Sequence, residues 1–203
     1  MSSLVGIVDY GAGNLASVDN AFSMLGYEVV RLDNPDDLDD CTHLVLPGVG
    51  SFASAMALLA RDRWREAIFT YLDAERPLLG ICLGMQLLFE TGNEGGVDVV
   101  GLGVFGGTVD LMPAAGSIKM PHIGWNEVSI NHRQHPLLCG VRDKTDFYFA
   151  HSYRCSFCEP DLVLATCNYG SEFPAVVGRN SVFATQFHPE KSQPAGLKII
   201  KNF

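Results

Sequence analysis

Cys82 lies at the centre of the sequence Gly80-Ile81-Cys82-Leu83-Gly84, with a glycine two residues before it and another two residues after it. The same pattern around a serine marks a nucleophile elbow, a sharp strand-to-helix turn that exposes the reactive side chain. A cysteine at this turn would lie at a helix N-terminus, where the helix dipole favours the thiolate. The pattern predicts a nucleophilic cysteine, and a buried, unreactive thiol is the alternative.

His188 and Glu190 have the side-chain types that such a nucleophile requires. A thiolate that attacks an acyl group needs a proton carrier, and histidine suits this role because it titrates near neutral pH. The histidine in turn needs a group that fixes its orientation, and Glu190 follows it by two residues, with Pro189 between them. The alternative is a pair of solvated polar groups at a strand end. His151 is the next candidate for the base, and we expect His43 to be structural.

The segments around these residues predict an α/β fold with an open, mostly parallel sheet flanked by helices. A strand over Leu4–Asp9, a helix to about Leu25 and a strand over Tyr27–Leu32 form a βαβ unit. Cys82 follows an apolar strand that starts at Leu78, and we expect the helix after it to end near Thr91-Gly92.

The remaining segments extend this pattern. We expect helices over residues 53–60, 64–74 and 195–203, a third strand over His43–Leu46, and a solvated acidic loop over Asn93–Asp98. Short β-rich pieces after Val99 predict antiparallel strands added to the same sheet.

The sequence Pro47-Gly48-Val49-Gly50 follows the third predicted strand. Ligands of open α/β sheets gather at the carboxyl ends of the strands, and glycines there leave backbone N–H groups accessible. We therefore consider an oxyanion hole or substrate cradle at this segment, with an ordinary turn as the alternative.

Length and composition limit the possible classes of protein. The chain has 203 residues, 47% of them hydrophobic, which suits one domain over residues 1–203. A net charge of −9 argues against nucleic acid, and no apolar run reaches the length of a membrane span. Residues 1–4 carry no charged signal-peptide segment, and the six cysteines are typical of reduced thiols, so we expect a cytoplasmic protein.

Two other motifs receive less weight. Gly11-Ala12-Gly13-Asn14-Leu15-Ala16, with Asp33 further on, fits a dinucleotide-binding fingerprint. A lone fingerprint is weak evidence, and we prefer the alternatives of a tight βα turn or a partner-binding loop at Asn14. His132, His135 and Cys139, like Cys155 and Cys158, have no second ligand pair at zinc-site spacing, so we expect no metal.

The Cys82 and His188 motifs together resemble the class I, or triad, glutamine amidotransferases, over nearly the whole chain. The stretches that carry the resemblance are Gly80–Gln86, Phe187–Glu190 and Pro47–Gly50. Three further stretches resemble one branch of that family, the glutaminase subunits of imidazole glycerol phosphate synthase. These stretches are Asp9–Leu15, Pro121–Asn126 and Phe149–Arg154.

The resemblance implies a Cys-His-Glu triad of Cys82, His188 and Glu190 that hydrolyses L-glutamine without a cofactor. It also implies oxyanion stabilisation by the N–H of Leu83 and one from Val49 or Gly50, in a flexible Gly48–Gly50 strand. The implied substrate contacts are Gly50, Gln86, Ser152 and Tyr153.

A cyclase subunit is the partner that the resemblance implies. It would use the ammonia to convert a phosphoribulosyl-formimino carboxamide ribonucleotide into imidazole glycerol phosphate and an aminoimidazole carboxamide ribotide, in histidine biosynthesis. Asn14 and Trp125 are our candidates for the face of this heterodimer, although Trp125 could also be a core aromatic. The alternatives are the amidotransferase of anthranilate or guanylate synthesis and a non-catalytic binding module on the same fold.

Overall fold

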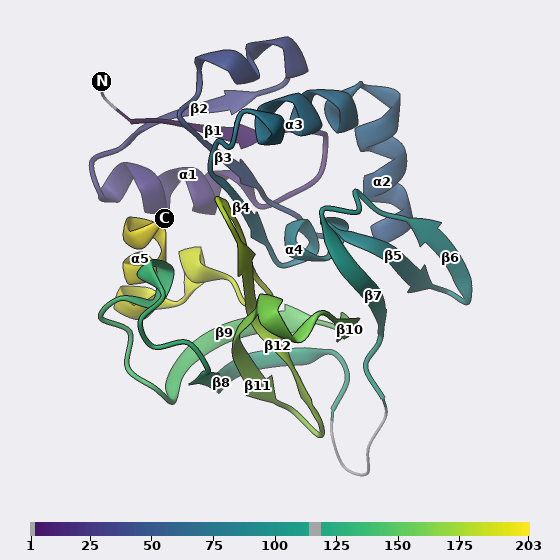
Figure 1. Cartoon of the computed structure of the whole chain (residues 1–203), viewed down its shortest axis with the longest axis vertical. Helices are drawn as coiled ribbons and strands as arrows, with labels where there is room; N and C mark the ends of the chain where they lie inside the picture. Colours follow the sequence, from purple (N-terminus) through teal and green to yellow (C-terminus); the bar gives the residue numbers. More distant parts are fainter. Residues whose placement is uncertain (1–2, 114–118) are drawn as a thin grey trace.

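A large mixed sheet forms the centre of the structure, with its strands in the order β2-β1-β3-β4-β13-β12-β11-β8-β9 (Figure 1). The computed structural model describes residues 3–113 and 119–203. Residues 1 and 2, which contribute to our expectation about a signal peptide, lie outside the described residues. The strands of this sheet are β1 (Leu4–Val8), β2 (Glu28–Leu32), β3 (His43–Leu46), β4 (Leu78–Ile81), β8 (His122–Ile130), β9 (Thr145–His151), β11 (Val163–Asn168), β12 (Glu172–Arg179) and β13 (Val182–Thr185).

The half of the sheet that carries Cys82 is parallel, as the βαβ pattern predicts. Strand β1 pairs in parallel with β2 and β3, and β4 pairs in parallel with β3 and β13. The other half is antiparallel and joins at β12. The α/β class and the added antiparallel strands are therefore confirmed.

Helices cover both faces of the parallel half because its strands are apolar on both sides. On β3, Leu44 and Leu46 belong to a buried cluster with α2 and α3, whereas Val45 belongs to a cluster with α1 and α5. The period-2 alternation of a strand places these neighbours on opposite faces. The helices are α1 (Leu15–Met24), α2 (Phe52–Arg61), α3 (Trp64–Asp73), α4 (Leu83–Leu87) and α5 (Gln193–Asn202).

A second sheet of four strands, in the order β10-β7-β5-β6, corrects two of our expectations. The helix after Cys82 ends at Leu87 and not near Gly92, because Phe89–Glu94 forms β5. The expected acidic loop is a hairpin of β5 with β6 (Val97–Val100), and Gly95-Gly96 forms its turn with φ of 68° and 80°. Two glycines with positive φ suit a type I′ turn, which matches the twist of a hairpin.

The strands β7 (Phe105–Leu111) and β10 (Tyr153–Cys158) complete this second sheet. Our expectation for the β-rich pieces after Val99 is therefore confirmed for β8, which joins the large sheet, and wrong for β7, which belongs to the second sheet. The chain leaves β9 at His151 and enters β10 at Tyr153, so this crossing point connects the two sheets. Ser152 and Tyr153 of the crossing line a pocket together with Cys82. In the described part of the chain, no helix is long and apolar enough to cross a membrane.

Gly84 allows the start of α4 to pack directly on the end of β3. A Cβ atom added to Gly84 would lie 1.8 Å from the carbonyl oxygen of Leu46, a distance that no relaxed structure tolerates. Gly26, in contrast, has nothing within 4 Å of an added Cβ, although its φ is +87°.

We expect Gly84→Ala to destabilise the fold by at least about 3 kcal/mol, the upper range for overpacking, because backbone atoms must move apart. Gly26→Ala is the matched control, since it adds the same methyl group and should cost only about 1 kcal/mol for its positive φ. Urea unfolding of both variants checks this, and equal midpoints would show that the contact does not constrain the fold.

Candidate active site

Cys82 lies in the turn between β4 and α4 with φ of 53° and ψ of −108°, a strained conformation for a residue with a Cβ atom. Its backbone N–H donates to the carbonyl of Thr185 at 2.8 Å, so the turn is held to the end of β13. The side chain is buried, with 5% of the residue exposed. This is the sharp strand-to-helix turn that the glycine pattern predicts.

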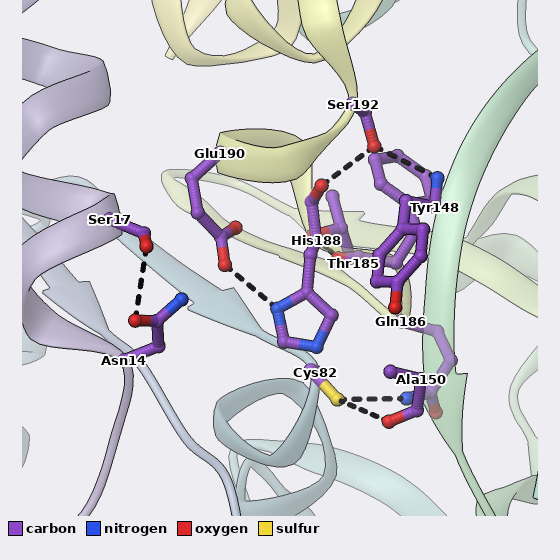
Figure 2. A network of polar contacts seen from close by, with 11 residues as sticks. Asn14, Ser17, Cys82, Tyr148, Ala150, Thr185, Gln186, His188, Glu190 and Ser192 are labelled. Carbon is purple, nitrogen blue, oxygen red and sulfur yellow. Dashed lines mark hydrogen bonds and ion pairs between the residues drawn. The ribbon is translucent and has the colours of Figure 1, made fainter. Parts of the chain in front are cut away.

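His188 and Glu190 meet beside this thiol. The Nδ1 atom of His188 lies 2.8 Å from Oε1 of Glu190, and the two side chains are only 3% and 1% exposed. Figure 2 shows the other ring nitrogen of His188 facing the sulfur of Cys82. The structure therefore brings together the three residues that the sequence motifs single out.

The surroundings of His188 favour its protonated form. Burial lowers the pKa of His188, but hydrogen bonds with Cys82 and with the Glu190 carboxylate outweigh burial and raise this pKa to about 10. An imidazolium between a thiolate and a carboxylate is the arrangement that a cysteine nucleophile needs before it attacks, because the leaving group must receive a proton.

Ser192 fixes the position of His188 relative to β9. Its hydroxyl donates to the carbonyl of His188 at 2.7 Å and accepts from the N–H of Tyr148 at 3.0 Å (Figure 2). The N–H of His188 also donates to the carbonyl of Tyr148 at 2.9 Å. Sequence reasoning assigned no role to Ser192, because a serine just before a helix usually indicates only a cap.

A small pocket of about 100 Å³ opens beside the sulfur of Cys82. Its lining includes most of the residues expected to form the oxyanion and substrate site, and it adds Ala150 and His151. The lining residues are Val49, Gly50, Cys82, Leu83, Gln86, Ala150, His151, Ser152 and Tyr153.

Gly48 lies behind this pocket and not in its wall. An added Cβ atom on Gly48 would meet the N atom of Gly84 and the Cβ of Leu83, each at 2.7 Å. The glycine segment therefore packs directly against the start of α4, which places Val49 and Gly50 beside Leu83. Tyr10 supports the same segment, since its hydroxyl donates to the carbonyl of Pro47 at 3.0 Å.

The turn over residues 11–14, which fits a dinucleotide fingerprint, packs against this same segment. A Cβ atom on Gly13 would lie 3.4 Å from Cγ of Pro47. Asn14 does not line the Cys82 pocket, and its side chain accepts from the hydroxyl of Ser17 at 3.1 Å.

Trp125 lies on β8, and it is 48% exposed, so it is not a buried core residue. The edge of its ring packs against Tyr148, with the centroids 6.0 Å apart. Ile123, two residues earlier on the same face of the strand, is 62% exposed. The described residues contain no group of three or more His, Cys, Asp or Glu side chains arranged to hold a metal ion.

Gln186 is a second residue that the motif reasoning left without a role. It is fully buried, and its amide nitrogen lies 3.8 Å from the sulfur of Cys82. Its carbonyl oxygen accepts from Nε2 of Gln86 at 3.1 Å. Its position directly before the Phe-His-Pro-Glu stretch could have indicated a role at the site, but a polar residue at a strand end is ordinarily interpreted as structural.

The chain is similar to known proteins over nearly its whole length. The family described as glutamine amidotransferase class-I matches residues 6–203. The imidazole glycerol phosphate synthase subunit HisH of Desulfitobacterium hafniense (strain DSM 10664 / DCB-2) is 46% identical over 98% of this chain and 93% of its own length. HisH 1 of Campylobacter jejuni (strain RM1221) is 46% identical over 98% of both chains.

A fused relative and two solved structures extend these comparisons. The chloroplastic imidazole glycerol phosphate synthase hisHF of Arabidopsis thaliana is 43% identical over 99% of this chain, which matches 34% of that protein. PurLQS from Thermotoga maritima has a TM-score of 0.80 at 21% identity, covering 100% of this chain and 97% of its own. A glutamine amidotransferase from the same organism has a TM-score of 0.65 at 17% identity, covering 99% of this chain and 82% of its own. These structures show a shared fold.

The strain at Cys82 leads to a stability prediction. We expect Cys82→Gly to be more stable than Cys82→Ala by about 1 kcal/mol, because glycine adopts a positive φ without a Cβ clash and this gain exceeds its entropy cost. Thermal unfolding of the two variants measures the difference. At an ordinary helical position the order is reversed, so a more stable alanine variant would show that the turn is relaxed.

The raised pKa of His188 leads to a prediction about pH. Its protonated form stabilises the folded state fully below the ordinary pKa of 6.5, and this contribution is lost as pH rises through about 10. Glu190→Gln removes one of the groups that raise this pKa, so we expect a smaller loss of stability between pH 6.5 and 10 than in the native chain. Urea unfolding under reducing conditions across this range checks the prediction.

Glu159→Gln is the control for this series, because it removes a carboxylate that is 48% exposed and bonded to Arg179. We expect its pH profile to follow the native one. Identical profiles for the Glu190 variant and the native chain would contradict the assigned coupling between Glu190 and His188.

Proposed function

Because the chain belongs to the class I glutamine amidotransferase family, among its HisH-type members, we propose that it is the glutaminase subunit of an imidazole glycerol phosphate synthase. The observation that supports this most directly is the buried arrangement of Cys82, His188 and Glu190 beside a small pocket. We also propose that residues 1–203 act as one domain, since the family match extends over residues 6–203.

In the proposed reaction, the thiolate of Cys82 attacks the side-chain amide carbon of L-glutamine. The N–H of Leu83 and one from Val49 or Gly50 stabilise the oxyanion, a type of contact worth roughly 10²–10³-fold in rate. His188 gives its proton to the departing ammonia, which leaves a γ-glutamyl thioester on Cys82. His188 then takes a proton from water, the hydroxide attacks the thioester, and glutamate leaves as the thiolate is restored.

Glu190 orients His188 through this cycle. The substrate contacts come from Gly50, Gln86, Ser152 and Tyr153, all of which line the pocket.

Ammonia must stay uncharged to act as a nucleophile, and in water at neutral pH it would be protonated to ammonium. We propose that a cyclase subunit of the HisF type receives it, consistent with the fused hisHF relative, in which this chain matches 34% of the length.

Glutamine hydrolysis by the chain, alone and with a HisF-type cyclase plus its nucleotide ligand, tests the proposal. We expect glutamate release that increases with both additions, and a loss of at least about 10³-fold in Cys82→Ala, because the nucleophile is removed. Cys139→Ala is the matched control, since this thiol is exposed and distant in sequence from the site. Absence of glutamate release from the complete complex would contradict the proposal.

The proposed partner face includes Trp125 and Asn14, of which Trp125 supplies the larger exposed apolar surface. We expect Trp125→Ala to weaken binding of the cyclase at least about tenfold, as tryptophan anchors commonly do. Val97→Ala is the control, because Val97 is 63% exposed but lies on β6 of the second sheet. Calorimetric titration distinguishes the two variants, and full affinity of a folded Trp125→Ala protein would remove this residue from the interface.

A further inference from the structure

Two buried histidines outside the proposed triad form a chain of hydrogen bonds that leads into the Cys82 pocket. Nδ1 of His122 lies 3.1 Å from Nε2 of His151, and Nδ1 of His151 lies 2.8 Å from the carbonyl oxygen of Tyr153. That oxygen also accepts from Nε2 of Gln86 at 2.7 Å. The two histidines come from neighbouring strands, since His122 and His151 are partners in the pairing of β8 with β9.

The carbonyl oxygen at one end of this chain determines where every proton lies. A carbonyl oxygen only accepts, so His151 must donate from Nδ1. Nε2 of a neutral His151 then carries a lone pair, and it must accept from Nδ1–H of His122. Nε2 of His122 is left as an acceptor, and the amide nitrogen of Asn126 lies 3.5 Å from it. Both rings are thus neutral Nδ1–H tautomers.

The surroundings of the two rings are consistent with this assignment. The ring of His122 stacks between Phe149 and Tyr169, with centroid distances of 4.7 and 3.9 Å. Burial lowers the pKa of His122 to about 4 and that of His151 to about 3, so neither ring carries a charge at neutral pH. With both nitrogens engaged, His151 is not available as a substitute base, the role for which the sequence made it the next candidate.

Beyond the Tyr153 carbonyl the chain ends at Gln86, which lines the pocket. Its Nε2 donates to Tyr153 and to Oε1 of Gln186, and these two bonds determine which way its carboxamide faces. In this orientation the carbonyl oxygen of Gln86 is the atom that remains for a ligand. If the Tyr153 carbonyl moved, the carboxamide could turn over and present its NH₂ group, which would repel a substrate ammonium group.

We propose that His122 and His151 are positioning residues for glutamine, which lock the Tyr153 carbonyl and thereby keep the carbonyl oxygen of Gln86 directed at the bound substrate. This inference rests on the proposed glutaminase function and specifies how its substrate site is held. His122 does not line the pocket, and His151, which does, has both ring nitrogens engaged in other hydrogen bonds. We therefore expect both histidines to act on substrate affinity and not on the chemical step.

The kinetic test uses variants that separate ring shape from hydrogen bonding, in the complex with a HisF-type cyclase and its nucleotide ligand. His122→Phe keeps a flat ring between Phe149 and Tyr169 but cannot donate, so His151 is free to change tautomer and release Tyr153. We expect its KM for glutamine to rise about tenfold with kcat within about threefold, the signature of lost binding in the ground and transition states alike.

His122→Asn and His151→Asn place an amide donor near the position of each Nδ1, and we expect them to restore KM to within about threefold of the native value. His135→Asn is the control, because the ring of His135 also bonds to the backbone, where it accepts from the N–H of Leu137, but it lies outside the chain. Folded His122→Phe with an unchanged KM, or with a lower kcat at the same KM, would overturn the proposal.

Nitrogen-15 NMR of the histidine side chains tests the assigned tautomers of His122 and His151 independently of an activity measurement. At pH 7 we expect two neutral histidines with Nδ1–H, assigned by their loss in His122→Phe and His151→Asn. Nε2–H tautomers or charged rings at these positions would overturn the assignment even if KM changes. If the native complex releases no glutamate while the tautomers are as expected, the proposed function is wrong, but the hydrogen-bond chain from His122 to Tyr153 is still part of the fold.

Discussion

The direct packing of backbone on backbone between the start of α4 and the end of β3 is the constraint on which the site depends. Gly84 faces the carbonyl of Leu46, and Gly48 faces the N atom of Gly84, so neither position has room for a side chain. The strained turn at Cys82 lies directly before this contact, and Val49 and Gly50 lie next to Leu83 in the same pocket. The nucleophile and the proposed oxyanion donors are therefore positioned by one packing interaction, and burial of the surrounding apolar strands stabilises it.

Strand β13, at the border between the parallel and antiparallel halves of the sheet, positions the remaining groups. His188 follows β13, which pairs with β4, so the histidine and the cysteine emerge from adjacent strands at the same edge. Bonds from Ser192 and from the backbone of Tyr148 then fix the loop after β13 against β9. A buried carboxylate at Glu190 is costly to desolvate, and its contact with a protonated His188 offsets that cost.

Local patterns in the sequence predicted the parallel half of the fold and the residues that meet at Cys82. The βαβ unit, the third strand and the glycines around Cys82 each have a short-range signature. His188 and Glu190 are also close in sequence, and a short 3-10 turn over Pro189–Lys191 joins them. The second sheet was not predicted, because the helix formers after Cys82 meet no stop signal before Gly92, and the mostly polar segment Phe89–Glu94 has no strand pattern. Which sheet a short strand joins depends on tertiary pairing, which periodicity does not encode.

The polar groups behind the pocket were equally hidden from the sequence. These groups act through partners that are distant in sequence: His122 and His151 are 29 residues apart, and Gln86 and Gln186 are 100 residues apart. A local sequence pattern does not indicate such contacts. Their chemistry becomes apparent only when their donors and acceptors are followed from atom to atom. The carbonyl of Tyr153 is the point at which this buried network meets the substrate pocket.

The central claim is that the fold makes the thiol of Cys82, paired with His188, the nucleophile for a glutamine side chain. The reactivity of Cys82 towards an electrophilic analogue of glutamine tests this claim most directly. Peptide mapping of the labelled complex with its cyclase partner should locate the label on Cys82 and not on the other cysteines, and His188→Ala should slow labelling by at least about tenfold. Labelling of another cysteine, or equal rates with and without His188, would contradict the account.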